Sequence, residues 1–258
     1  GLLKPEINDS DVLGSSITLP YFKVISKNKD LTFTPIWFDS DTTMASLEYR
    51  QENKNSSLLT DIGFVNGYKS PTTRKKNSRS HLFFHFKNDL LFEDYISSDL
   101  NISFEKVYGD QYLNIFDQYI TKSTLRPGDF NSSTSKIKIN LDHEKFNFAS
   151  GIESYEDLNV DNNNDKYQYV LPYYSFDKNM EQNYFGGNIS FGSSGSNVLN
   201  NTNKLETNII NNLTYNSLDL ITNLGFKNNF GINLKNLNSV GKKSSKYKSS
   251  IQLSLIHI

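Results

Sequence analysis

The chain has no cysteine, which excludes disulfide bonds and thiolate metal sites. Its longest apolar runs, such as Leu82–Phe84, are only a few residues, whereas a membrane-spanning helix needs about 20. Basic residues number 27 and acidic residues 28, and no basic stripe is interleaved with aromatic residues. The sequence therefore does not predict a nucleic-acid surface.

Aromatic side chains are plentiful in a chain that is polar on average. Only 36% of the 258 residues are hydrophobic, yet 18 are Phe and 15 are Tyr. This combination suits β-strands that have one apolar and one polar face, in which successive side chains point to opposite sides. The segment 45–50 is the clearest example: one face would carry Ala45, Leu47 and Tyr49, and the other Ser46, Glu48 and Arg50.

Segments of this kind recur along the chain, and no helical stretch of ordinary length interrupts them. We predict roughly thirteen strands in an antiparallel up-and-down sheet, which excludes a parallel βαβ architecture. The predicted strands include Ser16–Ile25, Ser57–Asn66, Tyr167–Phe176, Tyr184–Phe191, Lys204–Tyr215, Leu218–Phe226, Phe230–Leu237 and Tyr247–Leu255.

Polar segments are predicted to connect these strands. Gly67–Ser80 is expected to be an exposed loop, in which the basic cluster of Arg74, Lys75, Lys76 and Arg79 is solvated. Gly109–Arg126 is expected to be a loop with a short helical turn at Tyr112–Phe116, where the apolar spacing becomes helical. Asn159–Asp165 is expected to be a tight turn.

Two all-β architectures fit this pattern. A transmembrane β-strand needs about 9 to 11 residues with every second one apolar, so an outer-membrane β-barrel is one of them. A soluble β-sandwich or jelly roll is the other, although its strands are usually shorter. It also has no need to keep Thr, Ser, Asn and Lys so regularly opposite Phe, Tyr, Leu and Ile. The pattern alone leaves both open.

The N-terminal stretch resembles a known family. The junction and first barrel strands of the LPS-assembly outer-membrane protein family (LptD, also called OstA) are similar, in order and spacing, to Gly1–Pro5, Leu19–Phe22, Asn28–Pro35 and Glu48–Arg50. Two later segments also resemble parts of that family: Asp110–Phe116 is similar to a loop, and Tyr167–Pro172 to a strand. Beyond Ser190 only the rhythm of the strands agrees.

This resemblance implies an antiparallel, up-and-down transmembrane β-barrel in the outer membrane of a Gram-negative bacterium. Such a barrel inserts lipopolysaccharide into the outer leaflet through a lateral gate between its first and last strands. Because the chain begins at Gly1 and ends within a strand-like run, we expect a fragment that lacks the closing strands. Residues 1–13 would be the junction from a missing periplasmic jelly roll, and residues 14–258 the N-terminal half of the barrel.

The resemblance also implies partners. A plug lipoprotein (LptE-like) would sit inside the barrel, and a periplasmic LPS-bridge protein would deliver lipopolysaccharide through the missing jelly roll. The barrel exterior would contact outer-membrane lipid. The alternatives that we keep are a porin-like outer-membrane channel and a soluble β-sandwich binding module. A simple porin has no reason to carry the junction motif.

Two prolines are the candidate residues of the lateral gate. Pro5 and Pro20 match the positions of the family's gate prolines, and a proline cannot donate a ladder hydrogen bond. They would therefore weaken the seam that has to open. In the alternative interpretation, Pro5 ends a linker and Pro20 marks a bulge.

The alternation assigns the two faces of the predicted barrel. Residues expected to face the lumen are Ser46, Glu48, Arg50, Lys136 and Lys138. Residues expected to face lipid are Leu47, Tyr49, Phe84, Phe86, Ile102 and Phe104. Trp37 and tyrosines near strand ends would form an aromatic girdle at the membrane interface.

The sequence does not predict an enzyme. His81 and His85 would lie about 13 Å apart on a strand, too far to share a metal ion. Asp161–Asp165 imitates the start of a calcium loop, but Lys166 and Pro172 stand where Gly and Glu are needed. No nucleophile elbow, phosphate-binding loop or zinc signature is present. We therefore expect no catalytic residue, no metal and no cofactor.

Overall fold

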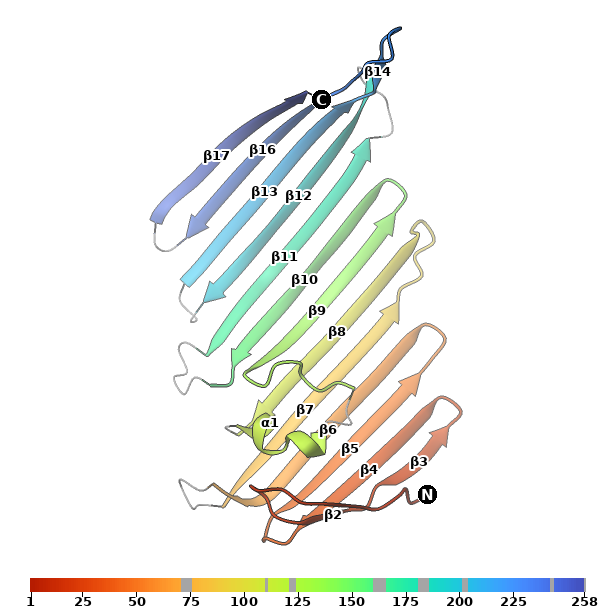
Figure 1. Ribbon diagram of the computed structural model, residues 1–258, viewed down its shortest axis with the longest axis vertical. Helices are drawn as coiled ribbons and strands as arrows, with labels where there is room; N and C mark the ends of the chain where they lie inside the picture. Colours follow the sequence, from red (N-terminus) through yellow and green to blue (C-terminus); the bar gives the residue numbers. More distant parts are fainter. Residues whose placement is uncertain are drawn as a thin grey trace. The chain divides into compact units, whose positions relative to one another are not determined.

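The computed structural model describes residues 1–70, 76–109, 111–120, 124–159, 166–180, 186–200, 204–241 and 244–257. It is all-β, with two single-turn helices, and its main sheet is antiparallel and up-and-down (Figure 1). Within the described ranges no helix has the length and apolar character needed to cross a membrane.

The described part of the chain contains twelve strands of 10 to 14 residues and five short ones. The long strands are β4 (Lys29–Phe38), β5 (Thr43–Glu52), β6 (Ser56–Lys69), β7 (Lys76–Asp89), β8 (Ser97–Tyr108), β9 (Ser132–His143), β10 (Phe146–Asp157), β11 (Tyr167–Met180), β12 (Gly187–Asn200), β13 (Lys204–Ser217), β16 (Phe230–Gly241) and β17 (Ser244–His257). The short strands are β1 (Glu6–Asn8), β2 (Ser16–Thr18), β3 (Tyr21–Ser26), β14 (Leu220–Ile221) and β15 (Lys227–Asn228).

Hydrogen bonding joins the strands almost in chain order. The sheet runs β1-β2-β4 and then through each successive strand from β5 to β13, ending in β16-β17, while β3 also pairs with β4. β14 and β15 form a separate two-stranded hairpin. The chain divides into two compact units, which we describe separately: Gly1–Asp89, Leu100–Ile137 and Tyr155–Lys166 form unit 1, and Leu90–Asp99, Lys138–Ser154 and Tyr167–Ile258 form unit 2.

The prediction of a large antiparallel sheet is confirmed, but three details were wrong. The strand predicted over Ser16–Ile25 is interrupted at Leu19–Pro20, because Pro20 has no N–H to donate. The strand predicted over Leu218–Phe226 is instead the two-residue strand β14 and the turn that leads to β15. The loop predicted over Gly67–Ser80 is shorter, since β6 continues to Lys69 and β7 begins at Lys76.

The core of unit 1 lies between one face of the sheet and a helical connection. The helical turn predicted after Gly109 is confirmed as α1 (Tyr112–Ile115), which is followed by α2 (Asp117–Ile120). These turns lie over the sheet (Figure 1) and contribute Tyr112, Leu113, Phe116 and Ile120 to a buried cluster. The sheet and its loops contribute Leu13, Ile36, Phe38, Met44, Val65, Tyr68, Phe83 and Val107. Thus the connection from β8 to β9 closes the core.

Strand register separates two chemically different faces in unit 1. Residues directly opposite in a ladder share a face, and Phe33, Leu47, Ile62 and Leu82 form one such row across β4 to β7. The neighbouring row on the other face runs through Thr34, Ser46, Gly63 and His81. The apolar face is open, with Phe33 40% and Phe64 53% exposed, whereas the α1–α2 connection lies on the polar face.

We expect Phe116→Ala to lower the free energy of unfolding by about 3–5 kcal/mol, because Phe116 is fully buried between the helical turns and the sheet. Urea unfolding of the folded chain measures this. Phe92→Ala is the matched control, since Phe92 is exposed, and it should cost less than about 1 kcal/mol. Equal losses for the two variants would contradict the assignment of the α1–α2 connection to the core.

Candidate functional site

The two prolines singled out from the sequence lie in one gap of the edge ladder of unit 1. β2 and β3 run one after the other along β4, and Pro20 lies in the break between them. On the outer side, the Leu3 N–H donates to the Pro20 carbonyl at 2.8 Å, and strand pairing resumes between Glu6 and Thr18. Pro5 therefore lies opposite the same break.

The edge formed by β1 and β2 has few backbone partners. β1 pairs with β2 over three residues, and β2 pairs with β4 over three residues. By comparison, the register between β4 and β5 extends over nine residue pairs, from Lys29–Gln51 to Trp37–Thr43. The structure thus places Pro5 and Pro20 at a margin of unit 1 whose ladders are short.

The polar residues predicted to face a lumen share one face of β5. Glu48 lies opposite Thr32 and Asp61, and Ser46 opposite Thr34 and Gly63. Arg50 lies opposite Asp30 and donates to its carboxylate at 2.7 Å. Lys136 and Lys138 lie on β9, two residues apart and so on one face of that strand.

The residues predicted to face lipid lie on the other face of β5 and β7. Leu47 lies opposite Phe33 and Ile62, and Tyr49 opposite Leu31 and Thr60. Phe84 and Phe86 continue this face on β7, opposite Thr60 and Leu58. Ile102 and Phe104 share one side of β8, where Phe104 is 40% exposed.

A cavity of about 310 Å³ lies between the polar face, the N-terminal segment and α2. Pro20 and Thr18 line it at the edge, Glu48 and Asp61 on the sheet, and Tyr119 on α2. The lining also includes Leu3, Lys4, Glu6, Asn8, Thr32, Thr34, Ile36, Ser46, His81, Gln118 and Ile120. The cavity thus has a mixed polar and apolar lining, and it joins the proline gap to the face on which the candidate lumen residues lie.

Two carboxylates face each other directly in this cavity. Glu48 and Asp61 are cross-strand partners, and like charges in that position destabilise a sheet. Part of the charge is offset, since Arg50 Nε lies 3.6 Å from Glu48 Oε1. Asp61 is almost fully buried, and its neighbour is His81, whose Nε2 lies 3.3 Å from Asp61 Oδ1 without hydrogen-bond geometry.

His81 anchors α1 to the sheet. Its Nδ1 lies 2.8 Å from the Tyr112 hydroxyl, and its ring stacks on Phe83 with centroids 4.4 Å apart. Burial, together with the Asp61 carboxylate, raises the pKa of the Tyr112 hydroxyl far above its usual value, so the hydroxyl stays protonated and can donate to Nδ1. Gly63 lies opposite His81, and its lack of a side chain leaves the space that the imidazole occupies.

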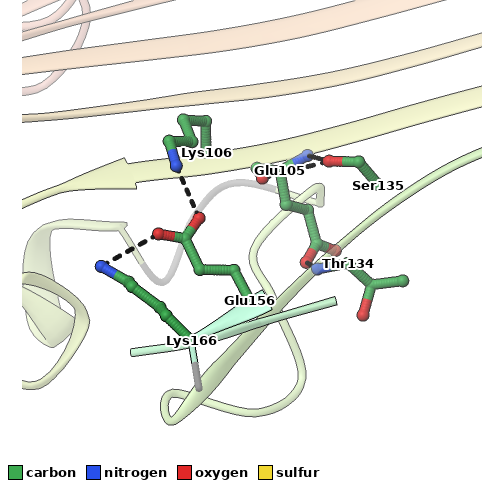
Figure 2. A network of polar contacts seen from close by, with 6 residues as sticks. All are labelled: Glu105, Lys106, Thr134, Ser135, Glu156 and Lys166. Carbon is green, nitrogen blue, oxygen red and sulfur yellow. Dashed lines mark hydrogen bonds and ion pairs between the residues drawn. The ribbon is translucent and has the colours of Figure 1, made fainter. Parts of the chain in front are cut away.

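A second polar network fastens the ends of β8, β9 and β10 (Figure 2). The Glu156 carboxylate accepts a hydrogen bond from Lys106 Nζ at 2.7 Å and lies 3.1 Å from Lys166 Nζ. Nearby, the Thr134 N–H donates to Glu105 Oε2 at 2.7 Å, and Ser135 Oγ bonds the backbone of Glu105. The acidic and basic side chains of this network balance one another. We therefore infer that the network holds the strand ends together and does not bind a ligand.

The sequence singled out several features whose placement differs from expectation. Arg79 is not solvated: it is buried on β7, with its guanidinium 4.8 Å from the centre of the Tyr68 ring. Lys76 is exposed and lies 3.1 Å from Asp41, while Arg74 and Lys75 lie outside the described residues. Most of the turn predicted over Asn159–Asp165 and the calcium-like segment within it also lie outside them. In the part of the chain that is described, no three acidic, His or Cys side chains are grouped for a metal ion.

Sequence reasoning missed Asp61, Ser16 and Tyr119. Asp61 interrupts the apolar run of β6, and its place beside Ile62 signals the polar face. Ser16 and Tyr119 are 103 residues apart, and no local pattern could have joined them. A search of protein-family models and of curated proteins found no match for the chain. The family resemblance therefore stays a prediction.

We expect Gly63→Ala to displace His81 and weaken the contact with α1, because the added Cβ would lie 2.3 Å from His81 Cε1 and 2.9 Å from the Tyr112 hydroxyl. Overpacking of this kind costs about 1–3 kcal/mol, which urea unfolding measures. Gly128→Ala is the matched control, since no atom lies within 4 Å of its added Cβ. An unchanged stability in Gly63→Ala would show that the imidazole does not need this space.

Proposed function

We propose that this chain is part of an outer-membrane β-barrel that inserts lipopolysaccharide into the outer leaflet, with the β1–β3 margin as one side of a lateral gate. The proposal depends on one combination of features: the sheet has one apolar and one polar face, and its margin is interrupted by two prolines. We infer lipopolysaccharide as the substrate because the sequence of that margin resembles the LPS-assembly family. The plug lipoprotein and the periplasmic LPS-bridge protein belong to the same proposal.

The open apolar face supports a lipid environment. Ile17, Phe33, Trp37, Ile62 and Phe64 are all exposed on strands of unit 1. Large apolar surfaces on soluble monomers are costly and usually mark a contact with a membrane or a partner. The strands are also long enough, since about 9 to 11 tilted residues cross the hydrocarbon layer and the long strands here have 10 to 14.

An aromatic row in unit 2 supports the same environment. Tyr95 packs edge-on against His143 and Phe146, and the rings of Phe146, Phe176 and Phe191 follow one another at 5.8 and 6.4 Å. The row continues through a ladder of leucines, because Phe191 lies opposite Leu213, which is followed by Leu234 and Leu253. Aromatic girdles of this kind occur where a barrel meets the membrane interface.

The opposite face of unit 2 is polar, as a lumen requires. Asn233 Nδ2 donates to Asn212 Oδ1 at 2.7 Å and lies 2.8 Å from Thr214 Oγ1. Asn212 and Thr214 flank Leu213 in the chain, so they lie on the face away from the leucine ladder. Such a face suits water or a polar plug better than acyl chains.

The gate is tested by photocrosslinking with a probe at Tyr21, beside Pro20, and a second probe at Leu47 on the apolar face. We expect lipopolysaccharide adducts at Tyr21 during transport, and fewer in Pro5→Ala/Pro20→Ala, because the restored N–H groups allow tighter pairing of the seam. Adducts at Leu47 report only membrane contact. Unchanged adducts and transport in the double variant would contradict the gate, and adducts with bulk lipid alone would favour a simple channel.

The membrane itself is tested by a matched pair of substitutions on neighbouring residues. Leu47→Arg should cost about 2–4 kcal/mol when the chain folds into lipid vesicles, because it places a charge on the lipid face. Ser46→Arg adds the same side chain to the polar face and should cost less than about 1 kcal/mol. A larger cost for Ser46→Arg than for Leu47→Arg would favour the soluble β-sandwich alternative. Efficient folding of both variants without lipid would also favour it.

A further inference from the structure

One serine hydroxyl joins three separate elements at the margin of unit 1. Ser16 Oγ on β2 lies 2.8 Å from the Tyr119 hydroxyl on α2 and donates to the Asn8 carbonyl on β1 at 3.4 Å. When the Ser16 proton is directed to Asn8, the Ser16 oxygen can accept a proton from Tyr119. The relay runs from α2 through β2 to β1.

The Tyr119 ring is held in place by apolar packing. It meets Phe38 edge-on, with ring centroids 5.0 Å apart, and Phe38 is the ladder partner of Ser16. Ser16 is 2% exposed, so little water competes for the hydrogen bond from Tyr119. The contact therefore combines a buried hydrogen bond with a fixed aromatic ring.

The margin depends on this contact because its strands β1 and β2 are short. β1 forms three ladder pairs with β2, and β2 forms three with β4. The proline gap separates these two strands from β3 and from the segment that precedes Pro5. A short strand gains little from cooperative pairing with its neighbours. The Tyr119–Ser16 bond therefore adds to the three ladder pairs of β2 with β4 and to the backbone bonds Leu19–Pro35 and Asp39–Ser15 that flank them.

We propose that Tyr119 is a positioning residue for the margin, and that the α1–α2 connection acts as a strap from β7 to β2. At one end Tyr112 bonds His81 on β7, and at the other Tyr119 bonds Ser16 on β2. The buried residues Leu113, Phe116 and Ile120 hold the strap on the sheet between these ends. The margin stays paired while the strap is docked.

A consequence for transport rests on the proposed function. If β1 and β2 form one side of a lateral gate, opening separates β1 from the last strand of the barrel. Any movement of β1 and β2 away from β4 at that seam would break the Tyr119–Ser16 bond or move α2 with them, so the strap would limit how far this side of the gate yields. The attachment of the margin is a property of the fold and does not depend on any lipid.

Hydrogen exchange of the full chain in detergent micelles tests the attachment. In Tyr119→Phe the ring and its packing on Phe38 remain, but the proton donated to Ser16 is lost. We expect the amides of Glu6–Asn8 and Ser16–Thr18 to exchange about fivefold faster, the effect of losing one buried hydrogen bond. Ser16→Ala should give at least the same increase, since it also removes the bond to the Asn8 carbonyl. Adding Tyr119→Phe to Ser16→Ala should give no further increase, because the Tyr119–Ser16 bond is already lost.

Tyr112→Phe is the matched control. It also removes one buried hydroxyl from the connection, but at the β7 end. Leu113, Phe116 and Ile120 still hold the connection on the sheet, so exchange in β1 and β2 should rise less than in Tyr119→Phe. The proposal is wrong if Tyr119→Phe leaves β1 and β2 unchanged, or if Tyr112→Phe accelerates their exchange equally. Additive effects of Ser16→Ala and Tyr119→Phe would also overturn it, since the two groups would then act independently.

Photocrosslinking at Tyr21 separates this proposal from the proposed function. Lipopolysaccharide adducts should increase in Tyr119→Phe if the strap restrains a gate. Faster exchange without adducts in any variant would support the strap and overturn the lipid gate. Adducts in the unmodified protein with unchanged exchange in Tyr119→Phe would support the gate and overturn the strap.

Discussion

The register between β4, β5, β6 and β7 is the constraint on which the rest of unit 1 depends. A slip of one residue would move every side chain to the other face, so that Leu47 and Ile62 would exchange places with Glu48 and Asp61. With the observed register, the polar face has room at Gly63 for the His81 ring, and that ring bonds Tyr112. The docking of α1, the cavity and the strap to β2 all follow from this alignment.

Alternation made the faces of the long strands predictable. The split of Leu47 and Tyr49 from Glu48 and Arg50 was evident from the sequence, because a period of two is a local property. The helical turn at Tyr112 was also evident, from a local change of period. The shorter Gly67–Ser80 loop was not, because ladder partners such as Phe64 and Val65 extend pairing to Ser80 and Arg79 of β7 despite polar residues there.

The candidate site was only partly predictable, for a different reason. The prolines stood out because their chemistry is distinctive, whereas the partners of Ser16 and His81 are set by contacts between distant segments. The buried position of Arg79 was missed because a charged residue in a basic cluster usually lies in water. Its guanidinium is instead covered by the Tyr68 ring, a packing arrangement that sequence alone does not encode.

The proline gap also has a consequence for contacts between separate copies of the chain. An edge with a full row of free N–H and C=O groups is a template on which strands of other molecules add, and this is a common route to aggregation. Pro5 and Pro20 remove two donors from the margin and leave β1 and β2 as strands of only three residues. The residues that loosen pairing within the molecule thereby also limit sheet growth between molecules, a hazard for a sheet whose apolar face is open.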